Sequence, residues 1–200
     1  SFTNSVNEGF VKWFNELSNK DVSIAGGKGA SLAEMFNAKI PVPPGFIITA
    51  QAYSYFLKSK NLNQKIHEII YNLNVDNTAE LNNASKEIRE IIESSNLPKE
   101  IGEEIIEAYE ILSMDRKKQA TVSEILKKSE DEPFVAVRSS ATTEDLADAS
   151  FAGQQDTYLN VRGKEDLLDK VKKCISSLFT ARAIYYREKK GFKHEEAKLA

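Results

Sequence analysis

The sequence predicts an α+β fold class, and two patterns along the chain carry this prediction. Short apolar runs rich in β-branched residues lie near both ends of the chain and are typical of strands. Between them, a long middle stretch repeats its apolar residues at helical spacing. We therefore expect residues 1–60 and 130–200 to form one α+β lobe, with residues 61–129 inserted as a helical unit.

The first part of the lobe is expected to alternate strands and helices around a glycine-rich turn. Apolar residues on one face predict a helix after the glycines, and the prolines that follow force the chain into an extended segment. The expected elements, in order, are a strand at 10–17, a tight turn at 26–29, a helix at 30–37, a strand at Phe46–Ile48 and a helix at 50–58.

The rest of the chain is expected to be mostly helical. In the middle stretch isoleucine and leucine recur every three or four positions, and near the end Gly191 is placed to terminate a helix, as glycine commonly does. The expected elements are three or four helices over 62–128, strands at 134–138 and Thr157–Val161, and helices at 165–180 and Ala181–Lys190.

Composition and charge exclude several classes of protein. The 200 residues carry 27 Lys and Arg against 30 Asp and Glu, and the formal net charge of −3 argues against a nucleic-acid-binding surface. No apolar run approaches the ~20 residues of a membrane span, and the first residues do not resemble a signal peptide. The single cysteine excludes an internal disulfide. We expect a cytoplasmic protein that binds neither nucleic acid nor membrane.

Two stretches have the residue types that bind phosphate. The glycine-rich turn at 26–29 combines backbone N–H groups, the positive end of the following helix and the cation of Lys28, without the spacing of a Walker A motif. Arg138 ends an apolar strand beside hydroxyl-bearing residues, where a guanidinium can hold an oxyanion. Each has a structural alternative, namely a plain turn with a solvent-facing lysine, and an arginine that pairs with Glu144 or Asp145.

Three blocks of sequence resemble one family, the phosphoenolpyruvate-utilising dikinases, in the order in which the family has them. The blocks are Ala-Gly-Gly-Lys-Gly-Ala-Ser-Leu-Ala-Glu-Met at 25–35, Arg-Ser-Ser-Ala-Thr-Thr-Glu-Asp at 138–145, and Ser-Leu-Phe-Thr-Ala-Arg-Ala-Ile-Tyr-Tyr-Arg at 177–187. The family includes phosphoenolpyruvate synthase, which the wording resembles most closely, pyruvate phosphate dikinase and rifamycin phosphotransferase. The stretch between about 60 and 130 carries no recognised motif.

The resemblance implies the first lobe of an ATP-grasp-like nucleotide-binding domain, with ATP as the ligand. It makes Lys28 and Arg138 the ATP-phosphate cations, and it places Gly153 and Thr157 where the family contacts the nucleotide. Read from the residues alone, Gly153 is a turn glycine and Thr157 an ordinary strand threonine. Mg²⁺ would accompany the ATP, and the resemblance puts its ligands beyond residue 200.

No catalytic residue and no metal ligand is assigned within the 200 residues. The acids after Arg138 are interpreted as a solvated loop, and Cys174 as a small core residue. His67 and His194 are not candidates for the family's phosphohistidine, which lies in a separate domain within a motif that this sequence lacks. The solvated acids are Glu144, Asp145, Asp148 and Asp156.

The resemblance further implies an N-terminal piece of a multidomain enzyme that converts ATP, pyruvate and water to AMP, phosphoenolpyruvate and phosphate. Its partners would be a phosphohistidine domain and a pyruvate domain of the same parent chain, and the piece alone is expected to be inactive. Rifamycin phosphotransferase and pyruvate phosphate dikinase are the alternatives within the family. A non-catalytic binding or interaction module is the alternative of a different class.

Overall fold

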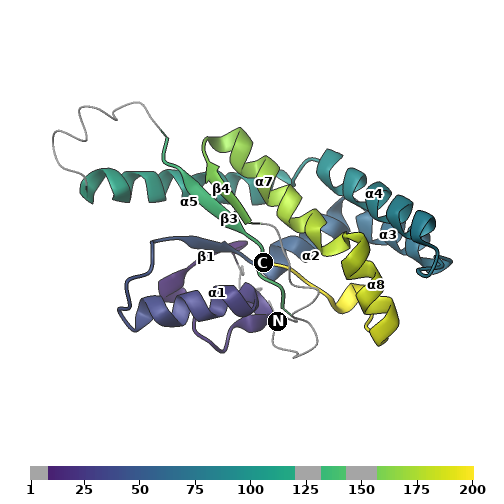
Figure 1. The fold of residues 1–200 in the computed structure, drawn as a ribbon. Coiled ribbons are helices and arrows are strands. Elements are labelled where there is room, and N and C mark those ends of the chain that lie inside the picture. The colour runs from purple at the N-terminus through teal and green to yellow at the C-terminus, as the bar shows by residue number, and fades with distance from the viewer. Residues whose placement is uncertain (1–8, 120–131, 143–156) are drawn as a thin grey trace, which may run out of the picture.

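The computed structural model describes residues 9–119, 132–142 and 157–200, and within them helices pack around two small antiparallel sheets (Figure 1). This agrees with the expected α+β class. The strands are β1 (Val11–Trp13), β2 (Phe46–Ile48), β3 (Val135–Arg138) and β4 (Thr157–Val161). The helices are α1 (Val22–Asn37), α2 (Ala50–Ser59), α3 (Leu62–Tyr71), α4 (Thr78–Ser94), α5 (Lys99–Gln119), α7 (Lys164–Ser176) and α8 (Ala181–Lys190).

The predicted strand at 10–17 is shorter in the structure and ends at Trp13. A 3-10 helix, Phe14–Glu16, follows it directly. The carboxylate of Glu16 accepts a hydrogen bond of 2.8 Å from the Trp13 backbone N–H, which turns the chain away from the extended path. β1 pairs with β2 in antiparallel register, with Val11 opposite Ile48.

The glycine-rich stretch is not a turn that precedes a helix, as predicted, but lies inside α1. The helix starts at Val22, where the Asp21 carbonyl accepts a 2.8 Å hydrogen bond from the Ala25 N–H. It is then interrupted at Gly26, whose φ of 69° and ψ of 173° are non-helical. Backbone of this kind is essentially restricted to glycine, so Gly26 divides α1 into a short first turn and a longer second segment.

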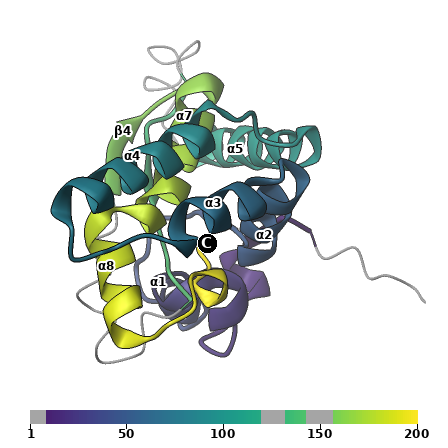
Figure 2. The ribbon, with the colours of Figure 1, turned by 90° about the vertical axis from the view of Figure 1, so that its right-hand side faces the viewer.

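The helices lie close together (Figure 2). One large hydrophobic core joins most of them, with α2 to α5 contributing alongside α7, α8 and β4. Ile88 of α4 and Ile184 of α8 are fully buried in it. The Ser85 hydroxyl of α4 donates a 2.7 Å hydrogen bond to the Phe179 carbonyl between α7 and α8. The helices of residues 62–119 therefore pack directly on the last part of the chain, and the division into a lobe and an insert stays a prediction.

A second, smaller core lies under α1 and β2. Ala25 and Ala33 of α1 are fully buried there, and Phe14, Leu17 and Ile47 pack with them. Small residues on this face of α1 let the helix approach its neighbours closely, since they leave little side-chain volume between the backbones.

The segment after α8 is held by a buried arginine. Arg187 is 5% exposed, and its guanidinium donates to the Leu178 carbonyl and, through Nε, to Nδ1 of His194 at 2.9 Å. Because a guanidinium can only donate, His194 must be neutral with its proton on Nε2. That proton is donated to the Glu188 carboxylate at 2.7 Å. The chain Leu178–Arg187–His194–Glu188 thus fixes the start of the C-terminal segment.

We expect the free energy of unfolding to fall as the pH drops below about 6.5, the ordinary value for histidine. Burial lowers the pKa of His194, against the opposing effect of the Glu188 hydrogen bond, so the folded state favours the neutral ring. The contribution is complete above the unfolded pKa and is lost as the pH falls towards the folded pKa. Urea unfolding at pH 7 and pH 5 measures this loss.

The second histidine of the chain provides a matched control for this pH dependence. Replacing His194 by glutamine should flatten the change in stability between pH 7 and pH 5. Replacing His67 by glutamine should leave the change in place, because the His67 side chain is 54% exposed and takes no part in the hydrogen-bonded chain from Leu178 to Glu188. An equal slope in His194→Gln and the wild type would contradict the assignment.

Candidate functional site

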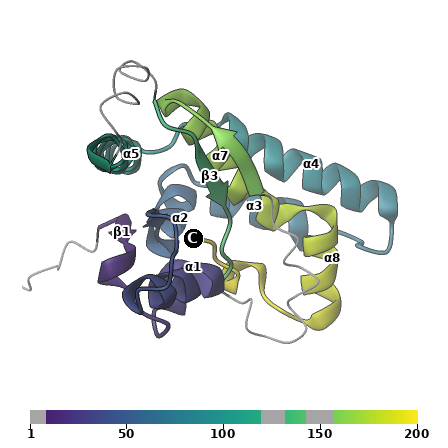
Figure 3. The ribbon, with the colours of Figure 1, turned by 60° about the vertical axis from the view of Figure 1, so that its left-hand side comes forward.

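The two sequence motifs predicted to bind phosphate are in direct contact, although more than a hundred residues separate them. The chain that leaves β3 runs towards α1 and passes the C-terminal segment (Figure 3). There the Gly29 backbone N–H donates a 3.0 Å hydrogen bond to the Ser140 hydroxyl, and the Gly27 N–H donates one of 3.1 Å to the Ala141 carbonyl. The start of the second segment of α1 is thereby fastened to residues 140–141.

These contacts change the role expected of the glycine-rich stretch. It was predicted to offer its backbone N–H groups to phosphate, but the N–H groups of Gly27 and Gly29 are already bonded within the protein. The prediction is wrong for those two donors. What the stretch leaves on the surface is the side chain of Lys28, which is exposed while Gly26 and Gly29 are buried.

At Gly26 the backbone of α1 lies in close contact with Ser140. A Cβ atom built there would lie 2.2 Å from the Ser140 Oγ and 2.3 Å from the Ser140 carbonyl oxygen. No side chain fits at these distances, so the positive φ of Gly26 and the absence of a side chain serve the same contact.

The C-terminal segment supports residues 140–142 from the other side. Ser140 and Ala200 exchange two backbone hydrogen bonds of 2.9 and 2.8 Å, and Ala141 forms an antiparallel bridge with Leu199. The Thr142 N–H continues the ladder to the Lys198 carbonyl at 3.1 Å. Residues 140–142 therefore lie between the start of the second α1 segment and the end of the chain, with their backbone groups largely satisfied by these neighbours.

Arg138 and Thr157 lie directly opposite each other. They are Cα partners at one end of the β3–β4 pair, Arg138 as the last residue of β3 and Thr157 as the first of β4. Opposed residues of an antiparallel pair share a face of the sheet, and both of these are exposed. The structure thus brings Arg138 beside Thr157, and Arg138 lies two positions before Ser140, the residue that contacts Gly29. Gly153 lies outside the described residues.

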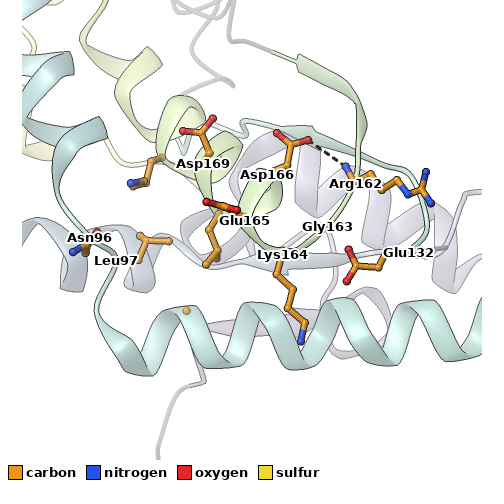
Figure 4. A pocket seen from close by; sticks show the side chains of 12 residues that line it. Asn96, Leu97, Glu132, Arg162, Gly163, Lys164, Glu165, Asp166 and Asp169 are labelled. Carbon is orange, nitrogen blue, oxygen red and sulfur yellow. Dashed lines mark hydrogen bonds between the residues drawn. The ribbon is translucent and has the colours of Figure 1, made fainter. Parts of the chain in front are cut away.

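A groove of about 1020 Å³ lies elsewhere, between α5 and the start of α7 (Figure 4). It borders the end of the hairpin where Val135 pairs with Val161, which is opposite to the end that carries Arg138. The four carboxylates of its lining outnumber the three cations, so the groove offers no net positive charge to a phosphate, and we do not place the phosphate site there. These acids are Glu132, Glu165, Asp166 and Asp169.

Other sequence predictions can be placed in the described part of the chain. No three His, Cys, Asp or Glu side chains are grouped there as metal ligands. Cys174 is buried in the large core, as predicted. The acidic loop residues predicted to be solvated lie outside the described ranges. Among the described helices, none combines the length and the apolar character needed to cross a membrane.

Sequence reasoning missed the role of Ser140. It was interpreted with its neighbours as a turn or helix-cap residue, yet it is 7% exposed and meets Gly29 from 111 positions away. The adjacent pair Gly26-Gly27 was the available signal, because paired glycines before a helix often mark a close backbone approach. Nothing in the sequence alone identifies which residue approaches.

The sequence of this chain is similar to those of known proteins. The family model described as "Pyruvate phosphate dikinase, AMP/ATP-binding domain" matches residues 22–200. A probable phosphoenolpyruvate synthase of Methanocaldococcus jannaschii is 55% identical over 191 residues, which cover 96% of this chain and 15% of that protein. The phosphoenolpyruvate synthase of Pyrococcus furiosus is 43% identical over 223 residues, which cover 96% of this chain and 26% of that protein. The phosphoenolpyruvate synthase of Helicobacter pylori is 46% identical over 195 residues, which cover 96% of this chain and 22% of that protein.

Proposed function

Because the chain belongs to the family of pyruvate phosphate dikinase AMP/ATP-binding domains, we propose that it binds the phosphate chain of ATP at the junction of its two motifs. Lys28, Arg138 and Thr157, with Gly153, are the proposed contacts. The observation that carries the proposal is the hydrogen bond between Gly29 and Ser140. It joins the residue after Lys28 to the residue two positions after Arg138, where β3 ends.

The chemistry of such a site is electrostatic. Phosphoryl transfer requires little covalent help from the protein, because its rate depends on positioning the nucleotide and on neutralising charge as it redistributes. An ammonium group from Lys28 and a guanidinium from Arg138 supply two fixed positive charges. The Thr157 hydroxyl, opposite Arg138, supplies a neutral donor to the same oxygens.

For the whole protein we propose the activity of a phosphoenolpyruvate synthase. The chain spans between 15% and 26% of the length of the relatives named above, so the remaining parts would supply the phosphohistidine domain, the pyruvate domain and the Mg²⁺ ligands. ATP, pyruvate and water would give AMP, phosphoenolpyruvate and phosphate in the cytoplasm, and the described lobe would be one half of an ATP-grasp-like domain. The names of these relatives favour the synthase over a rifamycin phosphotransferase or a pyruvate phosphate dikinase.

An ATP titration followed by backbone amide NMR tests the proposal against the alternative of a non-catalytic interaction module. We expect shifts to cluster at Lys28, Arg138, Gly153 and Thr157 with ATP. Adenosine, which has no phosphate, should leave these signals in place. Because this chain carries only part of the proposed site, the titration is repeated on the full-length protein. Absence of ATP-dependent shifts at these residues in the full-length protein would contradict the proposal.

A further inference from the structure

We propose that Ser140 is a positioning residue for the ATP site, which holds Lys28 in register with Arg138 by capping the second segment of α1 through space. The inference rests on the proposed function, because it concerns how the two proposed cations are kept at a fixed separation. Ser140 itself is buried, at 7% exposure, and is not assigned a contact with ATP.

The second segment of α1 begins with unsatisfied backbone donors. Gly26 has non-helical dihedral angles, so the N–H groups just after it are the first of a new helical run and lack partners one turn earlier. A Ser, Thr, Asp or Asn side chain at the residue before such a run commonly accepts from the second or third N–H. Gly26 has no side chain, and the space that a side chain would need is filled by Ser140.

The missing cap is supplied from the segment that follows Arg138. The Ser140 hydroxyl accepts from the N–H of Gly29, the third residue of the run, at 3.0 Å, and the Ala141 carbonyl accepts from Gly27, the first residue, at 3.1 Å. Lys28 lies between these two tethered residues. Its backbone is therefore fixed relative to residues 140–141, two positions beyond Arg138.

The hydroxyl is itself held in place. Both backbone groups of Ser140 are bonded to Ala200, at 2.9 and 2.8 Å, so residue 140 cannot shift without breaking a ladder on its far side. A change that removes only the hydroxyl leaves this ladder intact and releases the Gly29 N–H alone. We expect the first turn of the second α1 segment, which carries Lys28, to become less rigid, and the phosphates to bind more weakly as a result.

Ser140→Ala in the full-length protein tests the inference through the rate of ATP-dependent phosphorylation. An unsatisfied buried donor is costly, and we expect kcat/KM for ATP to fall by about tenfold. The value of kcat/KM for the acceptor should stay at the wild-type level, because the acceptor does not contact this turn in the proposed site. If Ser140 had a purely structural role, kcat/KM for ATP and kcat/KM for the acceptor would change together.

Ser85→Ala is the matched control. Ser85 is also buried, at 1% exposure, and its hydroxyl also bonds a backbone group far along the chain, the Phe179 carbonyl 94 positions away. It lies on α4, which packs against α3, α7 and α8. We expect it to lower the melting temperature as Ser140→Ala does, while leaving kcat/KM for ATP unchanged.

The outcomes separate this inference from the proposed function. If Ser140→Ala behaves like Ser85→Ala while Lys28→Met and Arg138→Ala lose activity, the positioning role is refuted and the ATP site stands. If Lys28→Met and Arg138→Ala keep wild-type rates, the proposed function fails as well. Should Ser140→Ala not fold, Ser140→Cys, whose sulfur is a weaker acceptor, is judged by the same kcat/KM criterion.

Discussion

Replacing Arg138 by alanine in the full-length protein should nearly abolish ATP-dependent phosphorylation while leaving the fold intact. The side chain is exposed at the end of β3, so its removal opens no cavity in either core. Loss of one charged contact to the transferring phosphate should cost roughly 2–4 kcal/mol of transition-state stabilisation, about 30- to 900-fold in rate. Phosphorylation of the protein by labelled ATP measures the effect, and circular dichroism verifies folding.

Arg162→Ala is a suitable control for the loss of one positive charge. Arg162 directly follows β4 at the opposite end of the same hairpin, where its guanidinium lies over the Phe134 ring at 5.1 Å. Its removal changes the net charge by the same amount but should leave the phosphorylation rate close to that of the wild type. A folded Arg138→Ala protein with the wild-type rate would refute the role given to Arg138.

Gly26→Ala should destabilise the protein by about 2–6 kcal/mol, the sum of a glycine-only backbone conformation and an overpacked contact. The new Cβ would lie 2.3 Å from the Ser140 carbonyl oxygen, which is bonded to the Ala200 N–H at 2.8 Å. Because that oxygen belongs to the backbone, it cannot rotate away as a flexible side chain would. Urea or guanidinium unfolding measures the loss, which should appear as a lower midpoint.

Gly102→Ala separates this contact from the general effect of adding a methyl group to a helix. Gly102 lies in α5, and a Cβ there would meet no atom within 4 Å. Alanine has the higher helix propensity, so this variant should be stabilised by up to about 1 kcal/mol. Equal stabilities of the Gly26→Ala and Gly102→Ala proteins would show that the approach to Ser140 is not tight.

Local patterns in the sequence predicted the elements whose causes are local. The end of α8 at Gly191 is one case, because that residue adopts a φ of 74° at the helix terminus. The break in α1 is the opposite case. Its cause is Ser140, which lies 114 positions from Gly26, and neither periodicity nor glycine content reveals such a partner. For the same reason Arg138 and Lys28 were found as separate motifs, and only the structure brings their backbones together.

Three chain segments meet at Ser140, namely those that carry Gly29, Ser140 itself and Ala200. Their separation in the sequence sets the order in which the site can assemble. Gly29 must wait for a partner 111 residues later, and that partner is in turn held by the pairing with Ala200. Contacts this distant in sequence are costly to close by chance, whereas α2 packs against α3, and α3 against α4, between helices that follow each other directly. During synthesis on the ribosome, the glycine-rich stretch therefore leaves the exit tunnel long before residue 140, its partner, and the pairing that holds Ser140 on its other side follows later with residue 200.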